Sequence, residues 1–556
     1  MTLQAILFVL IIIGGTALLS WPLGRYMAGV MDPKGGKGTM TGLFQAIVGP
    51  LGREEQGWKA YVFAILAFNI VIFTVVYLIQ TFQGALPFNP DGMGAVNPDL
   101  MFNTAASFTT NTNLQHYSGE ATYSYFTQLG GLMWLQFVTP AVGLAAPTAM
   151  ARALSGRALG NFWVDLQRAT FLVLLPLSLV FAALLVIGGL PMTFEGSVVA
   201  TTLEGVQQTI ARGPVAAFVT IKQLGTNGGG FFGPNSTHPL ENVSFYTNMI
   251  QMVAIIIVPM ACVWMFARIV GRIKHGFVIF AVMLCFVLIK TAGSVGFETA
   301  PTQAFNDLPI AQDVGNLEGK ELRFGATGGP LWAVLTTATS NGSVGAMHDS
   351  LNPLAGMMPM VGMWLNESFG GVGVGMINMF LYIVVAVFVA GMMIGRTPEY
   401  LGWRIEAREV KLALFALLAH GAFILLGTAI FAATPWGAET LNNSGPHGFS
   451  EILYEFTSAA ANNGSGFEGL GDNTVPWNIT TGLVMIFSRF IPIILPLAIV
   501  GFMSQKRRAT ESSGTLSVEG GVFATMLAVT VIVVGALTFF PAATLGPIAE
   551  HVMYMN

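Results

Sequence analysis

The sequence predicts an all-α integral membrane protein of about ten transmembrane helices, and three observations support this fold class. The chain is 53% hydrophobic and only 9% charged, whereas soluble proteins contain about 25% charged residues. Ten apolar runs are long enough to cross a bilayer, which takes about 20 residues. Four shorter apolar stretches each lead into a small polar loop. The formal net charge of −4 gives no reason to expect a nucleic-acid partner.

The apolar runs give the order of the membrane helices. The first run, 3–23, has no preceding basic residue and no small-residue cleavage site, so it predicts a membrane anchor rather than a signal peptide. The run 124–150 contains Pro140 and Pro147, so we expect a kink or a break there. The other eight runs lie at 60–81, 169–190, 246–268, 277–297, 371–395, 411–433, 478–502 and 521–541.

The basic residues predict the orientation. Five alternate inter-helix segments hold 18 of the 24 lysines and arginines, and the positive-inside rule places these segments in the cytoplasm. An even number of membrane helices then leaves both termini on the extracytoplasmic side. The five segments are 25–59, 152–168, 268–274, 396–411 and 505–508.

Four polar loops follow the short apolar stretches on the side opposite the basic segments. Each stretch begins with a proline, which is favoured in the first turn of a helix, so we expect four short re-entrant helices. The stretches are 98–110, 214–225, 330–340 and 446–461, and the asparagines 111, 227, 341 and 463 in the loops are spaced by 116, 114 and 122 residues.

This spacing predicts four repeats of helix, re-entrant pore helix, filter loop and helix. Non-helical backbone is tolerated at membrane depth only where protein buries it or a water-filled cavity receives it, so we expect the repeats to surround one pore. The predicted units are a leading helix in 1–25, pore repeats at 59–151, 165–270, 277–395 and 411–503, and a final helix at 521–543.

The loops have the composition of a site for a dehydrated cation. Glycine allows successive carbonyls to point the same way, and Thr, Ser and Asn add side-chain oxygens. Rings of carbonyls replace the hydration shell in potassium channels. The loops contain no carboxylate, which a divalent ion normally requires, so they favour a monovalent ion. Any one loop alone reads as an ordinary glycine-rich turn, but four copies favour the ion site. The candidate filter residues are Thr110, Asn111, Thr112, Asn113, Thr226, Asn227, Gly228, Gly229, Ser340, Asn341, Gly342, Ser343, Asn462, Asn463, Gly464 and Ser465.

Two further features are candidates for a gate or barrier. Arg489 lies within the run 478–502, and an intramembrane arginine faces a cavity or a partner. It is either a barrier beneath the filter or an arginine neutralised by a buried acid or by carbonyls. The segment 370–375 contains Gly371, Gly373 and Gly375, which indicate either a break in the helix or close packing through small residues.

Motifs for hydrolysis are missing from the sequence. It contains no GxxxxGK[ST] loop, no Asp-Lys-Thr-Gly phosphorylation motif and no HExxH arrangement of histidines. We therefore expect no cofactor and no enzymatic activity of this chain alone. If ATP drives transport, a partner chain must hydrolyse it.

Several longer motifs resemble the potassium-binding A subunit family of the Kdp potassium-transporting ATPases. They are SFTTNTNLQHYSGE (107–120), LGTNGGGFFGPNSTHP (224–239), EGKELRFG (318–325), AMHDS (346–350), GRTPEYLG (395–402), GPHGFSE (445–451) and ANNGSGFEGL (461–470). The resemblance covers nearly the whole chain.

The resemblance implies a subunit of a bacterial inner-membrane complex related to the Trk, Ktr and HKT potassium transporters. It implies that the four loops select K⁺ from outside, and that a P-type ATPase B subunit, a C subunit and a small F subunit are partners. It also implies that Arg489 lies behind the filter and that the segment 370–375 is a mobile loop. The alternative function is a stand-alone Trk/Ktr-type K⁺ channel or symporter, which would equally lack ATPase motifs.

Overall fold

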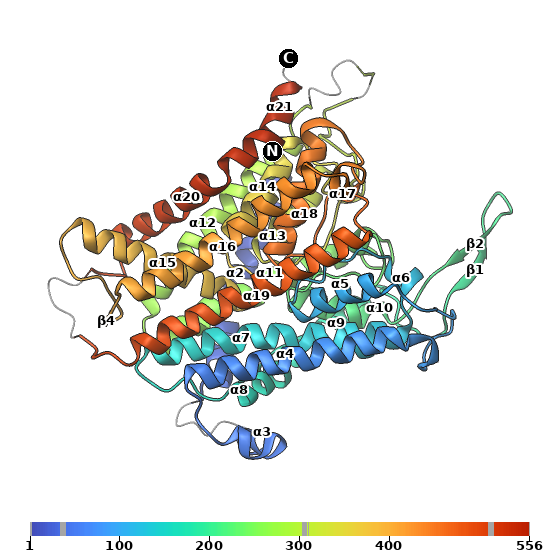
Figure 1. Cartoon of the computed structure of the whole chain (residues 1–556). Helices are drawn as coiled ribbons and strands as arrows, with labels where there is room; N and C mark the ends of the chain where they lie inside the picture. The colour runs from blue at the N-terminus through green and yellow to red at the C-terminus, as the bar shows by residue number, and fades with distance from the viewer. Residues whose placement is uncertain (1–2, 34–39, 303–307, 310, 510–515, 555–556) are drawn as a thin grey trace.

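The computed structural model describes residues 3–33, 40–302, 308–309, 311–509 and 516–554 (Figure 1). Within these ranges, ten helices are long and apolar enough to cross a membrane, and the two β-hairpins are small. The all-α membrane fold class is therefore confirmed. Lys34 and Lys37, which belong to the first predicted basic segment, lie outside the described residues.

The ten membrane helices agree closely with the predicted runs. The run with Pro140 and Pro147 is not broken, because α7 is continuous through both prolines. The spans are Leu3–Met31 (α1 Leu3–Val9, α2 Gly15–Met31), Trp58–Thr81 (α4), Thr127–Leu154 (a π-helical turn and α7 Trp134–Leu154), Phe162–Ile187 (α8 Phe162–Arg168, α9 Leu175–Ile187), Phe245–Val270 (α11), Ile273–Glu298 (α12), Val374–Met393 (α15), Ala407–Ala432 (α16), Val475–Met503 (α19) and Gly521–Met553 (α20 Gly521–Ala543, α21 Ala549–Met553).

Four short helices precede the polar loops: α5 (Pro98–Thr109), α10 (Val215–Leu224), α13 (Gly325–Ala338) and α18 (Gly445–Ala460). Prolines stand within one residue of the start of three of them, as expected. The expectation for Pro330 is wrong, because α13 begins five residues earlier at Gly325 and contains that proline. Gly325 has a φ of 62°, a conformation that suits glycine at a chain reversal.

A further apolar helix, α14 (Pro353–Leu365), lies between the third polar loop and α15. The sequence analysis did not predict it, because 13 residues are too few to span a bilayer. The chain between α14 and α15 is non-helical. The remaining elements are α3 (Thr41–Val48), α6 (Gly119–Thr122), α17 (Pro435–Ala438), the hairpin β1 (Val198–Thr201) with β2 (Gln207–Ile210), and the hairpin β3 (Glu399–Tyr400) with β4 (Trp403–Arg404).

The buried core lies around α7, α11 and α15. These helices are buried over most of their length, whereas the most apolar stretches of Phe162–Ile187 and Gly521–Met553 are only 22% and 28% buried. The exposed faces carry large apolar side chains such as Leu18, Leu179 and Leu537. Apolar surface of this kind is stable against lipid and unstable against water. The helices at the centre therefore enclose the polar loops, and the outer helices face the bilayer.

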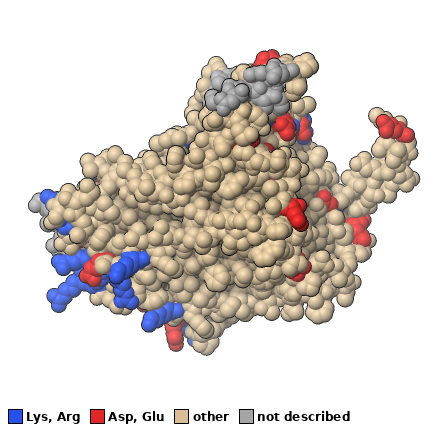
Figure 2. All heavy atoms as spheres, turned by 45° about the horizontal axis from the view of Figure 1, so that its top comes forward, with Lys and Arg blue, Asp and Glu red and all other residues tan. Residues whose placement is uncertain are grey.

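Charge is unevenly distributed along the molecule. Figure 2 shows lysine and arginine gathered at one end and most of the visible acidic residues elsewhere. The first membrane helix ends at Met31, beside the basic segment 25–59, and the last one begins at Gly521, after the basic segment 505–508. Leu3 and Met553 therefore both lie at the end opposite the basic residues. This agrees with the predicted pairing of the two termini on one side, and the side itself remains a prediction.

Candidate functional site

The four polar loops share one backbone geometry. Two residues after the last residue of each short helix, the chain turns through a residue of positive φ: Asn111, Thr226, Ser340 and Asn462, with φ of 66°, 49°, 45° and 50°. The next residue donates its backbone N–H to the carbonyl five residues back, in the pairs Thr112–Ser107 (2.9 Å), Asn227–Lys222 (2.9 Å), Asn341–Thr336 (2.8 Å) and Asn463–Ser458 (2.9 Å).

This geometry corrects the register of the first loop. The asparagine spacing pairs Asn111 with Asn227, but the backbone pairs Thr112 with Asn227, Asn341 and Asn463. The prediction is wrong by one residue, because the repeated property is the left-handed turn and its hydrogen bond, and asparagine occupies the turn position in two loops and the position directly after it in three.

Side-chain amides join the loops and the ends of their short helices into a closed ring, with at least one hydrogen bond at each of the four junctions. These hydrogen bonds fix the positions of loops that have no regular secondary structure of their own. The donors and acceptors are Asn111 Nδ2 to the Thr226 carbonyl (2.9 Å), Asn341 Nδ2 to the Lys222 carbonyl (3.1 Å), Asn463 Nδ2 to the Thr336 carbonyl (3.0 Å) and Asn462 Nδ2 to Thr112 Oγ1 (3.0 Å).

Three glycines allow the loops to approach this closely. Gly228, Gly342 and Gly464 occupy the same position of their loops and have φ of 77°, 91° and 106°. A Cβ on each would lie 2.0–2.1 Å from a backbone oxygen of the next loop. The oxygens belong to the equivalent residues Asn341, Asn463 and Thr112, so the packing repeats around the ring.

The structure brings all sixteen predicted filter residues into this ring. All are buried except Gly464, which is partly exposed, and none carries a charge. The short helices end at the ring, so the partly negative C-terminal ends of their dipoles lie beside it. Carbonyl and hydroxyl oxygens in an uncharged, buried setting can replace the water around a monovalent cation.

Arg489 lies beside a small cavity of about 40 Å³ that adjoins the ring. Ser340 and Asn462 of two of the polar loops and Gly371 also line this cavity. In the described part of the chain, Arg489 makes no hydrogen bond or ion pair with another protein group. The alternative in which a buried acid or carbonyl neutralises Arg489 therefore has no support, and its guanidinium is available to the cavity.

The glycine segment combines both expected features. Gly370 and Gly373 have φ of 57° and 79°, so the chain is broken ahead of α15. A Cβ on Gly373 would lie 1.9 Å from the carbonyl oxygen of Gly143 in α7, so the packing is also close. The backbone N–H of Val372 donates to Thr226 Oγ1 of the second loop at 2.9 Å. The segment therefore touches the ring directly.

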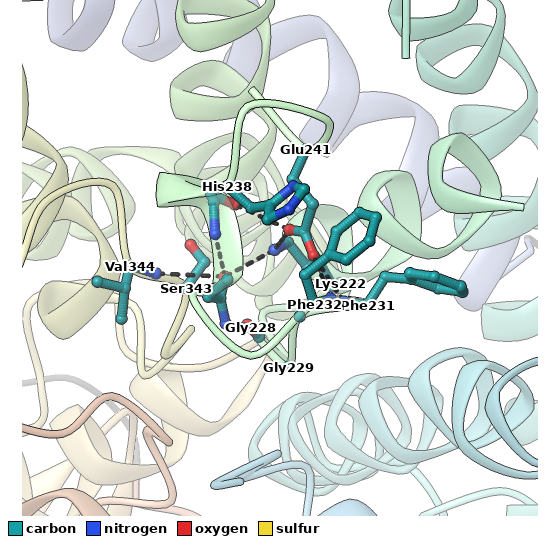
Figure 3. Close-up of polar contacts among 12 residues, drawn as sticks. Lys222, Gly228, Gly229, Phe231, Phe232, His238, Glu241, Ser343 and Val344 are labelled. Carbon is teal, nitrogen blue, oxygen red and sulfur yellow. Dashed lines mark hydrogen bonds and ion pairs between the residues drawn. The ribbon is translucent and has the colours of Figure 1, made fainter. Parts of the chain in front are cut away.

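The sequence analysis missed the polar groups behind the ring. Lys222 lies in α10 and pairs with Glu241, and both side chains are fully buried (Figure 3). His116 follows the first loop and contacts Glu455 of α18 at 3.1 Å. A lone lysine in an apolar stretch such as 214–225 is a usable signal for the first group, whereas the second joins residues more than 300 positions apart.

Comparison with known proteins assigns the chain to a family. The family model for the potassium-transporting ATPase A subunit matches residues 8–552. The chain belongs to this family. It is 48% identical over 551 residues to the "Potassium-transporting ATPase potassium-binding subunit" of Bacteroides fragilis, covering 96% of this chain and 97% of that relative. It is also 48% identical to the protein of the same name from Mesorhizobium japonicum, covering 100% and 99%.

A solved structure supports the fold of this A subunit family member independently. The crystal structure of the potassium transporter TrkH from Vibrio parahaemolyticus matches with a TM-score of 0.51 and 12% sequence identity. The match covers 89% of this chain and 98% of TrkH. At this identity the likeness concerns the fold alone. The family match and the ten apolar helices together establish a multi-pass membrane protein of the A subunit family.

Proposed function

We propose that this chain binds and selects K⁺ from the extracytoplasmic side and passes it on as the channel-like subunit of an ATP-driven, high-affinity uptake complex. The observation that carries the proposal is the closed ring of four uncharged loops with one repeated backbone geometry. The relatives named as potassium-binding subunits of a potassium-transporting ATPase support K⁺ as the ion.

The loops would bind the ion with oxygens from four sides. The four pore repeats, at 59–151, 165–270, 277–395 and 411–503, would each supply one loop to a single pore. The glycines with positive φ allow neighbouring loops to approach, and the asparagine bonds hold the distance between them. A ring held in this way resists collapse onto a smaller ion such as Na⁺, which is one physical route to selectivity.

Beneath the ring, Arg489 would act as a barrier. A fixed positive charge at the cavity repels a second cation and discourages free leakage through the pore. The segment that contains Gly371, Gly373 and Gly375 would control passage at the same level, because it contacts both the second loop and α7.

Energy for uphill transport would come from partner chains. We propose a P-type ATPase B subunit, a C subunit and a small F subunit as partners in a bacterial inner membrane, with both termini of this chain extracytoplasmic. This chain would bring no cofactor, and K⁺ would be its transported ligand. The family description as one subunit of an ATPase supports this assignment.

Copurification tests the proposal against a stand-alone Trk/Ktr-type channel or symporter. A tagged chain expressed with its neighbouring genes should be isolated with a P-type ATPase, and the complex should hydrolyse ATP in response to K⁺. K⁺ flux in liposomes that contain only this chain, with no copurifying ATPase, would instead establish the alternative.

A further inference from the structure

The four short helices carry different residues at one equivalent position. The carbonyl that accepts the hydrogen bond from the loop belongs to Ser107, Lys222, Thr336 and Ser458 in the four units. Three of these residues are hydroxyl residues, and each hydroxyl reaches its own loop or the residue just after it: Ser107 Oγ bonds the Leu114 carbonyl (2.9 Å), Thr336 Oγ1 bonds Asn341 Oδ1 (3.3 Å) and Ser458 Oγ accepts from the Gly464 N–H (2.9 Å). Lysine is the exception, and it stands behind the second loop.

Lys222 reaches past its loop to the segment that follows it. Its ammonium group donates to Asn235 Oδ1 at 2.7 Å and forms an ion pair with Glu241 (Figure 3). The other carboxylate oxygen of Glu241 accepts the backbone N–H groups of Phe231 (2.6 Å) and Phe232 (3.0 Å). The pair therefore fixes the backbone just beyond Gly230, where the chain leaves the ring.

Asn235 connects this charge pair to the ring itself. Its Nδ2 donates to the carbonyl oxygen of Gly228 at 2.6 Å. Its Oδ1 also lies 3.4 Å from the backbone nitrogen of Val344, directly after the third loop. The Gly228 carbonyl is thus held from the Asn235 side, and the junction between the second and third loops is held at the same point.

We propose that Lys222, Asn235 and Glu241 form a brace that positions the Gly228 carbonyl and thereby sets the discrimination of the ring between K⁺ and smaller cations. The inference rests on the proposed function. The brace would make the second loop more rigid than the other three. The four loops would then share one backbone geometry but differ in rigidity.

The cost of burying the charges supports a role beyond stability. A buried ion pair loses the hydration of both groups, and apolar residues of similar size often stabilise a fold as well or better. Hydroxyl residues at the equivalent position hold the other three loops without any charge. The longer lysine side chain differs from the hydroxyl residues because it links the second loop to Asn235 and Glu241, which lie 13 and 19 residues further along the chain.

Two variants test the brace in the intact complex. Lys222→Thr combined with Glu241→Gln gives the second unit the same residue type as the third and removes both buried charges together. Asn235→Ala keeps the Lys222–Glu241 ion pair but removes the bond to the Gly228 carbonyl, together with the bonds that Asn235 Oδ1 accepts from Lys222 Nζ and from the backbone N–H groups of Ser236 and Val344. Loss of one hydrogen bond of this kind corresponds to a change of about tenfold in an equilibrium constant. We expect each variant to reduce the K⁺/Na⁺ affinity ratio by about that factor, with weaker effects on Rb⁺.

A second buried lysine–glutamate pair supplies a matched control. Lys320 and Glu298 form an ion pair at 2.9 Å with both side chains buried, and neither hydrogen-bonds a filter residue. Lys320→Thr with Glu298→Gln should change the yield of folded complex without changing the K⁺/Na⁺ ratio.

The outcomes separate the brace from the proposed function. Equilibrium binding of K⁺, Rb⁺ and Na⁺ to purified complex measures the affinity ratio independently of the amount of protein. An unchanged ratio in Asn235→Ala overturns the brace, even where the double variant is not recovered. An equal ratio change in the control pair also overturns it. Absence of K⁺ binding by the unmodified complex would refute the proposed function instead.

Discussion

Replacing Gly342 by alanine is the sharpest test of the ring. Gly342 has a φ of 91°, and a Cβ there would lie 2.1 Å from the carbonyl oxygen of Asn463. Ordinary contact begins at 3.4 Å, so the third and fourth loops would have to separate by about 1.3 Å. The nearest atoms are all backbone, so no side chain can rotate away.

The expected loss follows from two costs. Holding a non-glycine residue in this backbone region costs roughly 1–3 kcal/mol, and overpacking a well-packed site costs about 1–3 kcal/mol more. If the ring must keep its geometry to bind K⁺, the sum of roughly 2–6 kcal/mol corresponds to a loss of about 30-fold to 20,000-fold in affinity.

Equilibrium K⁺ binding and K⁺-stimulated ATP hydrolysis by the purified complex measure this loss. Gly296→Ala is the matched control, because Gly296 lies within α12 and a Cβ there would meet nothing within 4 Å. Gly342→Ala with unchanged K⁺ affinity and selectivity would refute the argument that the close approach of the loops creates the site.

Three further predictions concern the surroundings of the ring. Arg489→Gln should raise K⁺ flux that is not coupled to ATP hydrolysis, because the barrier charge is lost. Unchanged ATP-independent K⁺ flux through this variant in liposomes would contradict the prediction. Gly373→Ala should abolish uptake, since its Cβ would lie 1.9 Å from a backbone oxygen, whereas Gly371→Ala, with 3.6 Å of room, should be tolerated. Burial by itself lowers the pKa of His447, but hydrogen bonds to Asp349 and a second carboxylate raise it to about 10. Because this pKa lies above the ordinary value of about 6.5, the stabilisation is complete below that pH and is lost as the pH rises through 10. The Tm in detergent should therefore fall between pH 7 and 10.5, and His447→Gln should flatten that fall.

The positions of the ten membrane helices were predictable from composition. A helix in lipid satisfies its own backbone hydrogen bonds, so a run of about 20 apolar residues is sufficient to identify it. The same reasoning missed α14, because a 13-residue helix is packed against neighbouring protein and leaves no signal of bilayer length. Pro330 was assigned to a helix start because proline is favoured in the first turn. The assignment was wrong because the turn at Gly325 starts the helix five residues earlier.

The sequence by itself determined the ten membrane helices, the pairing of the termini and the four polar loops, because these depend on local composition. Only the tertiary structure decided that Thr112 is the counterpart of Asn227, that Gly228 packs on Asn341, and that Lys222 and the Gly228 carbonyl both hydrogen-bond Asn235. These relations join residues from different repeats or across a turn. These contacts depend on how the helices pack, and the local sequence around a residue does not determine which distant residue will contact it.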